Sequence, residues 1–294
     1  MNDQITRAFV QQFADGFMLE AQQKDSRLQA TVTDIGGVTG TSFTANNMGA
    51  TEANEVVDRL GDTVWNDNPT NVRVAMMRDM DWATPIDKYD VPKLLANPQG
   101  AYTQNGIAAL NRKKDKVIYD ALVGASITRA AEAAPYGSIV LPANQKIVDG
   151  GTGMTKAKLI AAKKRFRQNE ADEYNGEQLY MLFSGDMLED ILADETLTSA
   201  DFMSVKMLMD GAVAQKWLGF TWIPYEALNV NAGGTVATTV AYAKSGAQFG
   251  TGLSREIDIG PRRDKRNATQ IYVGESYGAV RTQEAKVLTI DFVI

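Results

Sequence analysis

The stretch that decides the fold of this chain is Trp82–Gly124, which reads WATPIDKYDVPKLLANPQGAYTQNGIAALNRKKDKVIYDALVG. Asn97 and Pro98 form a helix-start signature. An Asn side chain accepts a hydrogen bond from a free backbone N–H, and Pro at the first helical position loses no hydrogen bond. Further along, the apolar residues recur at the spacing of one helical face. We therefore predict a long helix that ends at Val123, with Gly124 beyond its C-terminal end.

The composition limits the chemistry that the chain can carry out. It has 294 residues, no cysteine and no histidine, and a formal net charge of −6. The absence of cysteine excludes disulfides, thiolate nucleophiles and zinc sites that need sulfur, and the absence of histidine removes the commonest general base. The negative charge argues against strong, sequence-specific binding of nucleic acid. With 44% hydrophobic residues, the chain can bury a sizeable core.

The sequence contains none of the catalytic motifs that would indicate an active site. Adjacent carboxylates occur at three places, but neighbouring residues on a helix point about 100° apart, so such doublets are typical of surface charge. The sequence contains no P-loop, calcium loop or nucleophile elbow. No apolar run approaches the roughly 18 residues of a membrane span, and the N-terminus lacks a secretory signal. We therefore expect a non-enzymatic, cytosolic product that uses no cofactor and no metal.

For the region before the long helix, the sequence predicts one helix, loops and two strands. Residues 3–24 have the periodicity of an amphipathic helix, which would pack either on its own domain or on a neighbouring subunit. Residues 31–51 are rich in Gly, Thr, Ser and Asn, which favours loop and turn structure. Strands are predicted at 55–60 and 70–78. Together they suggest a long two-stranded excursion, which must lie on something to be stable.

The region after the long helix predicts alternating helices and strands. Residues 125–153 are expected to form an irregular surface segment. The helix at 155–169 carries a basic cluster, which is either a solvated face or a contact with nucleic acid or an acidic neighbour. A strand at 178–183 and a helix at 184–194 follow. The last residues, VLTIDFVI, alternate apolar and polar positions, which indicates a C-terminal strand within a sheet.

A basic run, RRDKR, occupies Arg262–Arg266 directly after a Gly-Pro pair. It is either a polar hairpin or loop, or an interaction patch that suits an acidic neighbouring subunit. No aromatic residue is interleaved with the basic residues, so the run is a poor platform for single-stranded nucleic acid.

The order of these features resembles the major capsid (coat) proteins of tailed bacteriophages. The resemblance rests on W-x-x-P-I-D-K-Y-D, K-L-L and N-P before the long helix, and on Arg112, Asp115 and Ile118 within it. A D-G pair and L-G-F in residues 202–228 are similar to the part of that family that surrounds the capsomer axis. The resemblance extends from residue 5 to the C-terminus.

The resemblance implies an α+β fold, the tailed-phage major capsid fold, in five parts. These are an N-terminal arm at 1–35, an extended β-hairpin loop at 36–95, a peripheral domain with a long spine helix and a sheet at 96–197, an axial domain at 198–254, and C-terminal strands at 255–294 that return to the peripheral domain.

The implied function is self-assembly into pentamers and hexamers of an icosahedral phage head that encloses double-stranded DNA. The chain would be part of the virion capsid and would assemble in the host cytoplasm. The implied partners are further copies of the chain, a separate scaffolding protein, a portal, and packaged DNA contacted weakly and non-specifically, with no membrane partner. The scaffolding protein is expected to be separate because a mature start at Met1 would leave no cleavable scaffolding segment.

Two alternatives remain open. One is an encapsulin-like compartment of the same fold that encloses a cargo enzyme. The more distant one is an enzyme that uses carboxylates, Lys or Tyr. For the capsid, aromatic and arginine side chains are the expected subunit contacts, because they dominate interface cores. The candidate contact residues are Phe9, Phe13, Trp65, Arg73, Arg78, Trp82, Arg262, Arg263 and Arg266.

Overall fold

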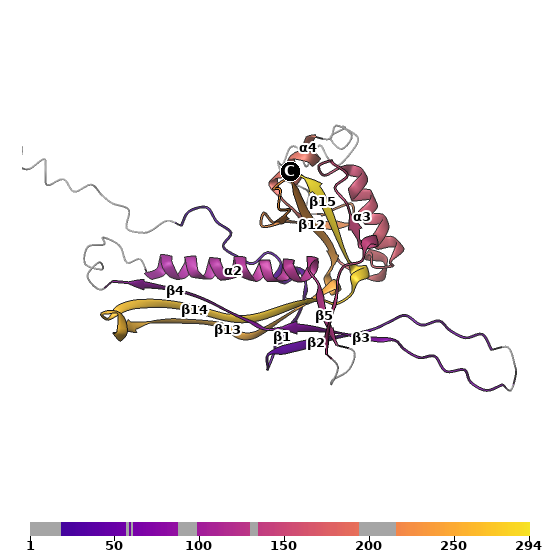
Figure 1. Cartoon of the computed structure of the whole chain (residues 1–294), viewed down its shortest axis with the longest axis horizontal. Helices are drawn as coiled ribbons and strands as arrows, with labels where there is room; N and C mark the ends of the chain where they lie inside the picture. Colours follow the sequence, from indigo (N-terminus) through magenta and orange to yellow (C-terminus); the bar gives the residue numbers. More distant parts are fainter. Residues whose placement is uncertain (1–18, 57–58, 60, 88–98, 130–134, 194–215) are drawn as a thin grey trace, which may run out of the picture. The chain divides into compact units, whose positions relative to one another are not determined.

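The computed structural model describes residues 19–56, 59, 61–87, 99–129, 135–193 and 216–294 (Figure 1). The chain divides into two compact units. The first comprises the residues up to Ser26, Asp79–Lys113 and Leu253–Ser276, and the second comprises Arg27–Arg78, Lys114–Gly252 and Tyr277–Ile294.

The first unit is built from part of a sheet and the first part of a long helix, α2 (Gln99–Val123). Its strands belong to β4 (Arg78–Ile86), β14 (Ala268–Arg281) and β13 (Ala247–Arg262), in that spatial order. Trp82 on β4 packs against Gly106 on α2, where an added Cβ would lie 2.4 Å from the indole ring. Glycine at 106 is therefore what lets the helix approach the strand so closely.

Helix α2 matches the long helix that the sequence predicts. The predicted first residues, Asn97 and Pro98, lie outside the described residues, but the helix ends at Val123 as expected. The Gly124 N–H donates to the Asp120 carbonyl at 2.8 Å. An added Cβ at Gly124 would lie 2.6 Å from that same oxygen. Glycine fits this end because it has no side chain to clash with the last helical turn.

The second unit contains a seven-stranded sheet with the order β7-β15-β12-β8-β10-β9, and β11 pairs with β12. Strand β12 is antiparallel to both β15 and β8, whereas β8 and β10 are parallel. The predicted C-terminal strand is therefore confirmed within the sheet, between β7 and β12. The strands are β7 (Lys146–Ile147), β8 (Leu179–Phe183), β9 (Lys216–Trp217), β10 (Phe220–Pro224), β11 (Asn229–Val230), β12 (Val236–Ala243) and β15 (Val287–Val293).

Two helices cover this sheet, α3 (Lys156–Gln168) and α4 (Gly185–Ala193), and both were predicted from the sequence (Figure 1). The Thr155 side chain caps α3 by accepting from the Lys158 N–H. The helices and the sheet enclose one large core, in which Phe166 and Phe220 meet edge to face with ring centroids 5.7 Å apart.

A second, fully antiparallel sheet in this unit has the order β2-β3-β5-β6. Its strands are β2 (Ser42–Met48), β3 (Thr70–Met76), β5 (Ser126–Arg129) and β6 (Tyr136–Ile139). A small core of Phe43, Ala45, Ala75 and Val280 holds β2 and β3 against the end of β14. Strand β1 (Thr33–Gly37) pairs in parallel with the start of β13. Short 3-10 turns lie at η1 (Gln29–Thr31), η3 (Ala143–Gln145), η4 (Glu173–Asn175), η5 (Lys244–Gly246), η6 (Arg263–Lys265) and η7 (Glu284–Lys286).

The structure corrects two predictions of irregular structure. Residues 31–51 were expected to be loop, but they carry β1 and β2, because Phe43 and Ala45 form a buried face that the Gly, Thr and Asn content conceals. Residues 125–153 were expected to be irregular, but they carry β5, β6 and β7. Strand β6 pairs with its neighbour β5, but β1, β2, β5 and β7 each pair with a strand outside their own segment, which local composition does not indicate.

Two further predictions place regular structure where the described residues show none. Of the predicted strand at 55–60, Glu55 and Val56 have no strand structure, and 57, 58 and 60 lie outside the described residues. The strand that pairs with β3 is β2 instead. Of the helix predicted at 3–24, residues 19–24 are not helical, and 3–18 lie outside the described residues.

Candidate functional site

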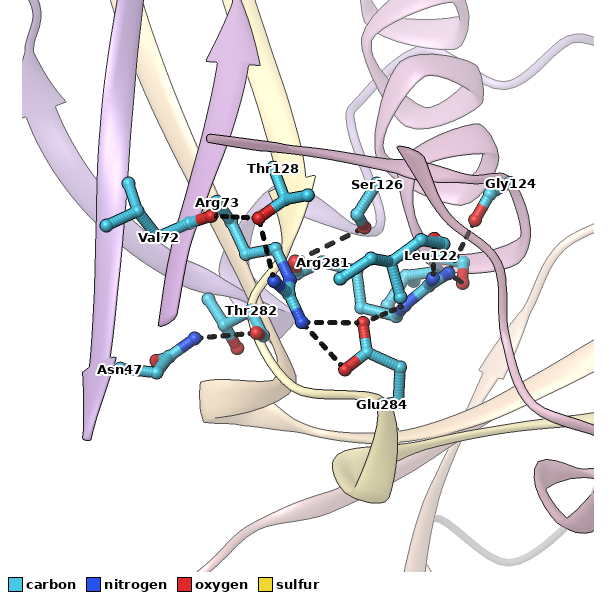
Figure 2. A network of polar contacts seen from close by, with 11 residues as sticks. Asn47, Val72, Arg73, Leu122, Gly124, Ser126, Thr128, Arg281, Thr282 and Glu284 are labelled. Carbon is cyan, nitrogen blue, oxygen red and sulfur yellow. Dashed lines mark hydrogen bonds and ion pairs between the residues drawn. The ribbon is translucent and has the colours of Figure 1, made fainter. Parts of the chain in front are cut away.

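The base of the long loop between β2 and β3 is fastened by a buried ion pair (Figure 2). The Arg73 side chain on β3 is 5% exposed and donates from Nη2 to both Glu284 carboxylate oxygens, at 3.2 and 3.0 Å. Its Nη1 donates to the Thr128 hydroxyl at 3.3 Å, and this hydroxyl donates in turn to the Val72 carbonyl at 2.8 Å. The ion pair therefore connects β3, β5 and η7, which come from distant parts of the chain.

A second arginine, Arg281, extends this network to the end of α2. Its side chain is fully buried, and Nη1 donates to the Leu122 and Gly124 carbonyls at 2.9 and 2.5 Å. Its Nη2 donates to the Ile139 carbonyl on β6 at 3.0 Å, and its Nε lies 3.7 Å from Glu284 Oε1. Burial lowers the pKa of Arg281, and the Glu284 carboxylate opposes this effect. The guanidinium stays charged and satisfies carbonyls at the C-terminal end of the helix.

The network of Arg73, Arg281 and Glu284 fixes the place where the loop leaves the sheet. Next to it, Asn47 on β2 donates to the Thr282 carbonyl at 2.6 Å, and Lys286 donates to Glu177 at 2.7 Å. Both strands that lead into the loop are therefore bound to the segment between β14 and β15, β2 through Thr282 and β3 through Glu284. We call this set of contacts the loop base.

The loop itself, residues 49–69, has few contacts with the rest of the described chain. Figure 1 shows two arms that continue from β2 and β3. Asn54 Nδ2 donates to Asn66 Oδ1 at 2.8 Å, and Asn66 Nδ2 donates to the Glu52 carbonyl at 2.7 Å. These bonds hold the arms to each other and to nothing else. Trp65 is 91% exposed, which leaves a large aromatic side chain in solvent.

The polar side of α2 holds the segment that precedes β1. Within the first unit, Asn111 donates to the Lys24 carbonyl at 2.7 Å, and Arg112 Nη1 donates to the Gln22 side-chain oxygen at 2.6 Å. Within the second unit, the buried Asp115 carboxylate accepts from the Arg27 and Leu28 backbone N–H groups at 2.9 and 3.2 Å. The polar residues that interrupt the apolar pattern of the helix thus bind extended backbone.

The basic run Arg262–Arg266 forms the turn between β13 and β14, which confirms the hairpin interpretation. Arg262 is fixed by Asp264, with Nε–Oδ1 at 2.8 Å, and by Gln270, with Nη1–Oε1 at 2.9 Å. The contact with Arg262 lowers the pKa of Asp264 to about 2. Arg263, Lys265 and Arg266 are exposed and have no ion-pair partner among the residues that the structure describes.

The basic cluster on α3 is partly neutralised within the chain. Lys163 forms an ion pair with Glu173, and Arg167 forms one with Asp172 at 2.9 Å. The pKa of Glu173 is lowered, chiefly by its bond with Lys163. Lys164 and Arg165 are exposed, so the described cluster is mostly the solvated face of a helix.

The structure gives the predicted contact residues different surroundings. Trp65 and the arginines of the basic turn are exposed, and so is Arg78. Arg73 is buried in the loop base, and the partly buried Trp82 packs against Gly106 of its own chain; as subunit contacts both stay predictions. Phe9 and Phe13 lie outside the described residues.

Sequence reasoning missed Arg281 and Glu284, which organise the loop base. The sequence signal was an arginine, Arg281, directly after the apolar Val280. The structure shows that both residues are buried. Sequence reasoning also left out Lys265, which lines a surface groove beside the basic turn.

The described residues contain no group of three or more Asp or Glu side chains that could hold a metal ion. Among the described helices, none is both long and apolar enough to cross a membrane. What the geometry does provide is a fixed base, an exposed loop with an aromatic side chain, and a basic turn.

Comparison with known proteins gives the family. A family model described as phage capsid protein matches residues 5–294, and the chain therefore belongs to the phage capsid protein family. Its role is that of a structural major capsid protein, located in the virion capsid, and an encapsulin-like compartment is not favoured. A search of curated proteins finds no match.

Solved structures share the fold at low sequence identity. A chain from Mycobacterium phage Che8 is 15% identical, with a TM-score of 0.68 over 96% of this chain and 97% of that one. The capsid of cyanophage P-SCSP1u is 14% identical, with a TM-score of 0.70 over 97% and 93%. The capsid of Ralstonia phage GP4 is 9% identical, with a TM-score of 0.72 over 97% and 95%. The α+β fold of tailed-phage capsid proteins is thus the fold of this chain.

Proposed function

We propose that this capsid protein assembles into pentamers and hexamers, which close an icosahedral head around double-stranded DNA. The observation that carries the proposal is the extended loop, whose Trp65 is 91% exposed in a single chain. Burial of an aromatic side chain on a neighbour is favourable, at roughly 25 cal/mol per Å² of apolar surface removed from water. A loop that lies across the next copy makes a heterologous contact, and heterologous contacts generate rings.

Electron microscopy of the expressed chain after size separation tests this proposal. The chain is studied alone and together with the products of its neighbouring open reading frames. Closed shells or capsomer rings are the expected result. A small, discrete oligomer that never assembles under either condition would overturn the proposal.

A loop-deletion variant separates assembly from folding. Met48 and Thr70 are directly paired across β2 and β3, so residues 49–69 can be replaced by a two-residue Asn-Gly turn. The loop base keeps its contacts, so we expect the variant to fold with the circular dichroism spectrum and unfolding midpoint of the parent chain. We expect it to form no shells. Shells from the loopless chain would contradict the role assigned to the loop.

The remaining partners belong to the same proposal. We expect a separate scaffolding protein and a portal, with assembly in the host cytoplasm and no catalytic activity. Contact with packaged DNA is expected to be weak and non-specific, because the net charge is −6 and only part of the α3 cluster is exposed. The division into arm, loop, peripheral and axial parts stays a prediction. Turnover of a substrate by a small oligomer would contradict the structural role.

A further inference from the structure

The exposed loop combines an aromatic side chain with negative charge. Trp65 is 91% exposed and its neighbour Val64 is 69% exposed. The described part of the loop carries four carboxylates and one arginine, Arg59. The carboxylates are Glu52, Glu55, Asp62 and Asp67. A surface that fits this loop needs an apolar depression with positive charge at its edge.

The first unit contains such a surface, a groove with a volume of about 450 Å³. Its apolar walls are Ala83 and Pro85 on β4 and Ala268 on β14. Its polar lining consists of Thr84, Asp87, Arg262, Lys265 and Gln270. The volume falls within the range of about 300 to 1,000 Å³ in which concave sites hold compact ligands. An indole ring is small enough to enter it.

The edge of the groove is positively charged and partly fixed in place. The turn contains Arg262, Arg263, Lys265 and Arg266 against one carboxylate, Asp264, and Asp87 adds a second carboxylate to the groove lining, which leaves a net positive charge. The Arg262 guanidinium is held by Asp264 and Gln270, so its planar face is already oriented before anything binds. A fixed guanidinium plane stacks well on an aromatic ring. Arg263, Lys265 and Arg266 remain to attract carboxylates.

We infer that the loop of one copy inserts Trp65 into the groove beside Arg262 and Lys265 of a second copy, with the loop carboxylates facing the basic turn. This inference rests on the proposed self-assembly and identifies the surface that receives the loop. The exposure of Trp65 shows that no described residue of its own chain covers it. Nucleic acid would be attracted to the turn but would leave Trp65 in water, and the acidic loop would repel it.

Split cysteine variants test the contact, because the natural chain has no cysteine. One protein carries Trp65→Cys and the other carries Thr84→Cys, a small replacement in the wall of the groove. The two are mixed before assembly and mildly oxidised. A disulfide forms only when the two Cα atoms come within about 7 Å. We expect a covalent dimer on a non-reducing gel, from assembled shells only.

Two further variants make the result decisive. Val64→Cys replaces Trp65→Cys in a parallel experiment, so that the tryptophan is kept if its loss prevents assembly. Tyr174→Cys replaces Thr84→Cys as the control, because Tyr174 is 77% exposed, belongs to the second unit and does not line the groove. Shells with no covalent dimer, or with equal dimer in the control, would overturn this inference alone. If the parent chain forms no shells, the proposed function fails as well.

Charge reversal tests the electrostatic half of the contact. Lys265→Glu or Asp62→Lys alone should slow cross-linking roughly tenfold at low salt, because each places like charges together. The two changes on opposite partners should restore the rate. If DNA occupies the basic turn instead, added DNA will suppress cross-linking and the double reversal will restore nothing, which would contradict the inference.

Discussion

The loop base and the loop that leaves it are adjacent in the chain but are held in opposite ways. At the base, two buried arginines share one carboxylate, and each donates to further partners. In the loop, the described hydrogen bonds join the two arms to each other, between the side chains of Asn54 and Asn66, from these side chains to backbone, and between the Gly49 and Pro69 backbones. The internal contacts of the chain therefore fix the direction in which the loop leaves the sheet, whereas the loop surface itself stays exposed.

The largest effect on folding is expected from Arg281→Leu. The change removes the bonds to the Leu122, Gly124 and Ile139 carbonyls and the ion pair with Glu284. Breaking a buried ion pair by removing one partner typically costs about 3–5 kcal/mol. Urea unfolding of the unassembled chain measures the loss. Arg263→Leu, at an exposed position, serves as control and should change stability by less than about 0.5 kcal/mol. Equal effects of the two changes would mean that the loop base is not what holds this region.

A glycine pair tests how tightly the base is packed. An added Cβ at Gly278 would lie 2.8 Å from the Met76 carbonyl, whereas one at Gly37 meets nothing within 4 Å. We expect Gly278→Ala to cost roughly 1–3 kcal/mol through overpacking. Gly37→Ala should be close to neutral. Thermal unfolding of both variants measures the difference, and a neutral Gly278→Ala would show that β14 and β3 can move apart freely.

An asparagine pair compares base and loop most directly. Asn47 in the base and Asn66 in the loop each donate one side-chain hydrogen bond to a backbone carbonyl, at 2.6 and 2.7 Å. Asn47 is partly buried and Asn66 is exposed. We expect Asn47→Ala to cost about 1 kcal/mol of unfolding free energy and Asn66→Ala less than about 0.5. Denaturant titration of both variants checks this, and a larger effect at Asn66 would reverse the comparison.

The smallest effect is a pH dependence at the edge of the base. Burial alone would raise the pKa of Glu177, but the bonds from Lys286 and Ser245 outweigh it and lower the pKa. A carboxylate with a lowered folded-state pKa stabilises the fold above its unfolded pKa of about 4.3 and loses this contribution as pH falls. Glu177→Gln should therefore flatten the acid limb of a stability profile, measured by urea unfolding between neutral and acidic pH. An unchanged acid limb would exclude this contribution.

Elements with a strong local sequence pattern could be predicted from the sequence, and elements that depend on distant partners could not. Helices α2 and α3 could be predicted because their apolar periodicity and start signals lie within the segment itself. Strands β1 and β2 could not, because their partners lie more than twenty residues away and their own composition is typical of turns. The arginine network was inaccessible for the same reason, since Arg73, Thr128 and Glu284 meet only in the folded chain.

The candidate contact residues also fall into two groups, those that the structure leaves exposed and those that pack within their own chain. Residue type alone indicated Trp65 and the basic turn, and the structure leaves both exposed. Residue type also indicated Arg73 and Trp82, but the partners of these side chains lie within their own chain. An aromatic or arginine side chain suits the inside of a subunit as well as its surface, so only the fold distinguishes the two uses.

In the turn between β9 and β10, one residue, Leu218, meets two opposing physical requirements. Leu218 and Gly219 both have positive φ, at 52° and 76°, as a two-residue hairpin turn requires. Asparagine or glycine would adopt this backbone more easily than leucine. Leu218, however, also packs against the large core of the second unit. Replacing Leu218 by glycine or asparagine would therefore relieve backbone strain but lose packing against the core, and the two effects on stability oppose each other.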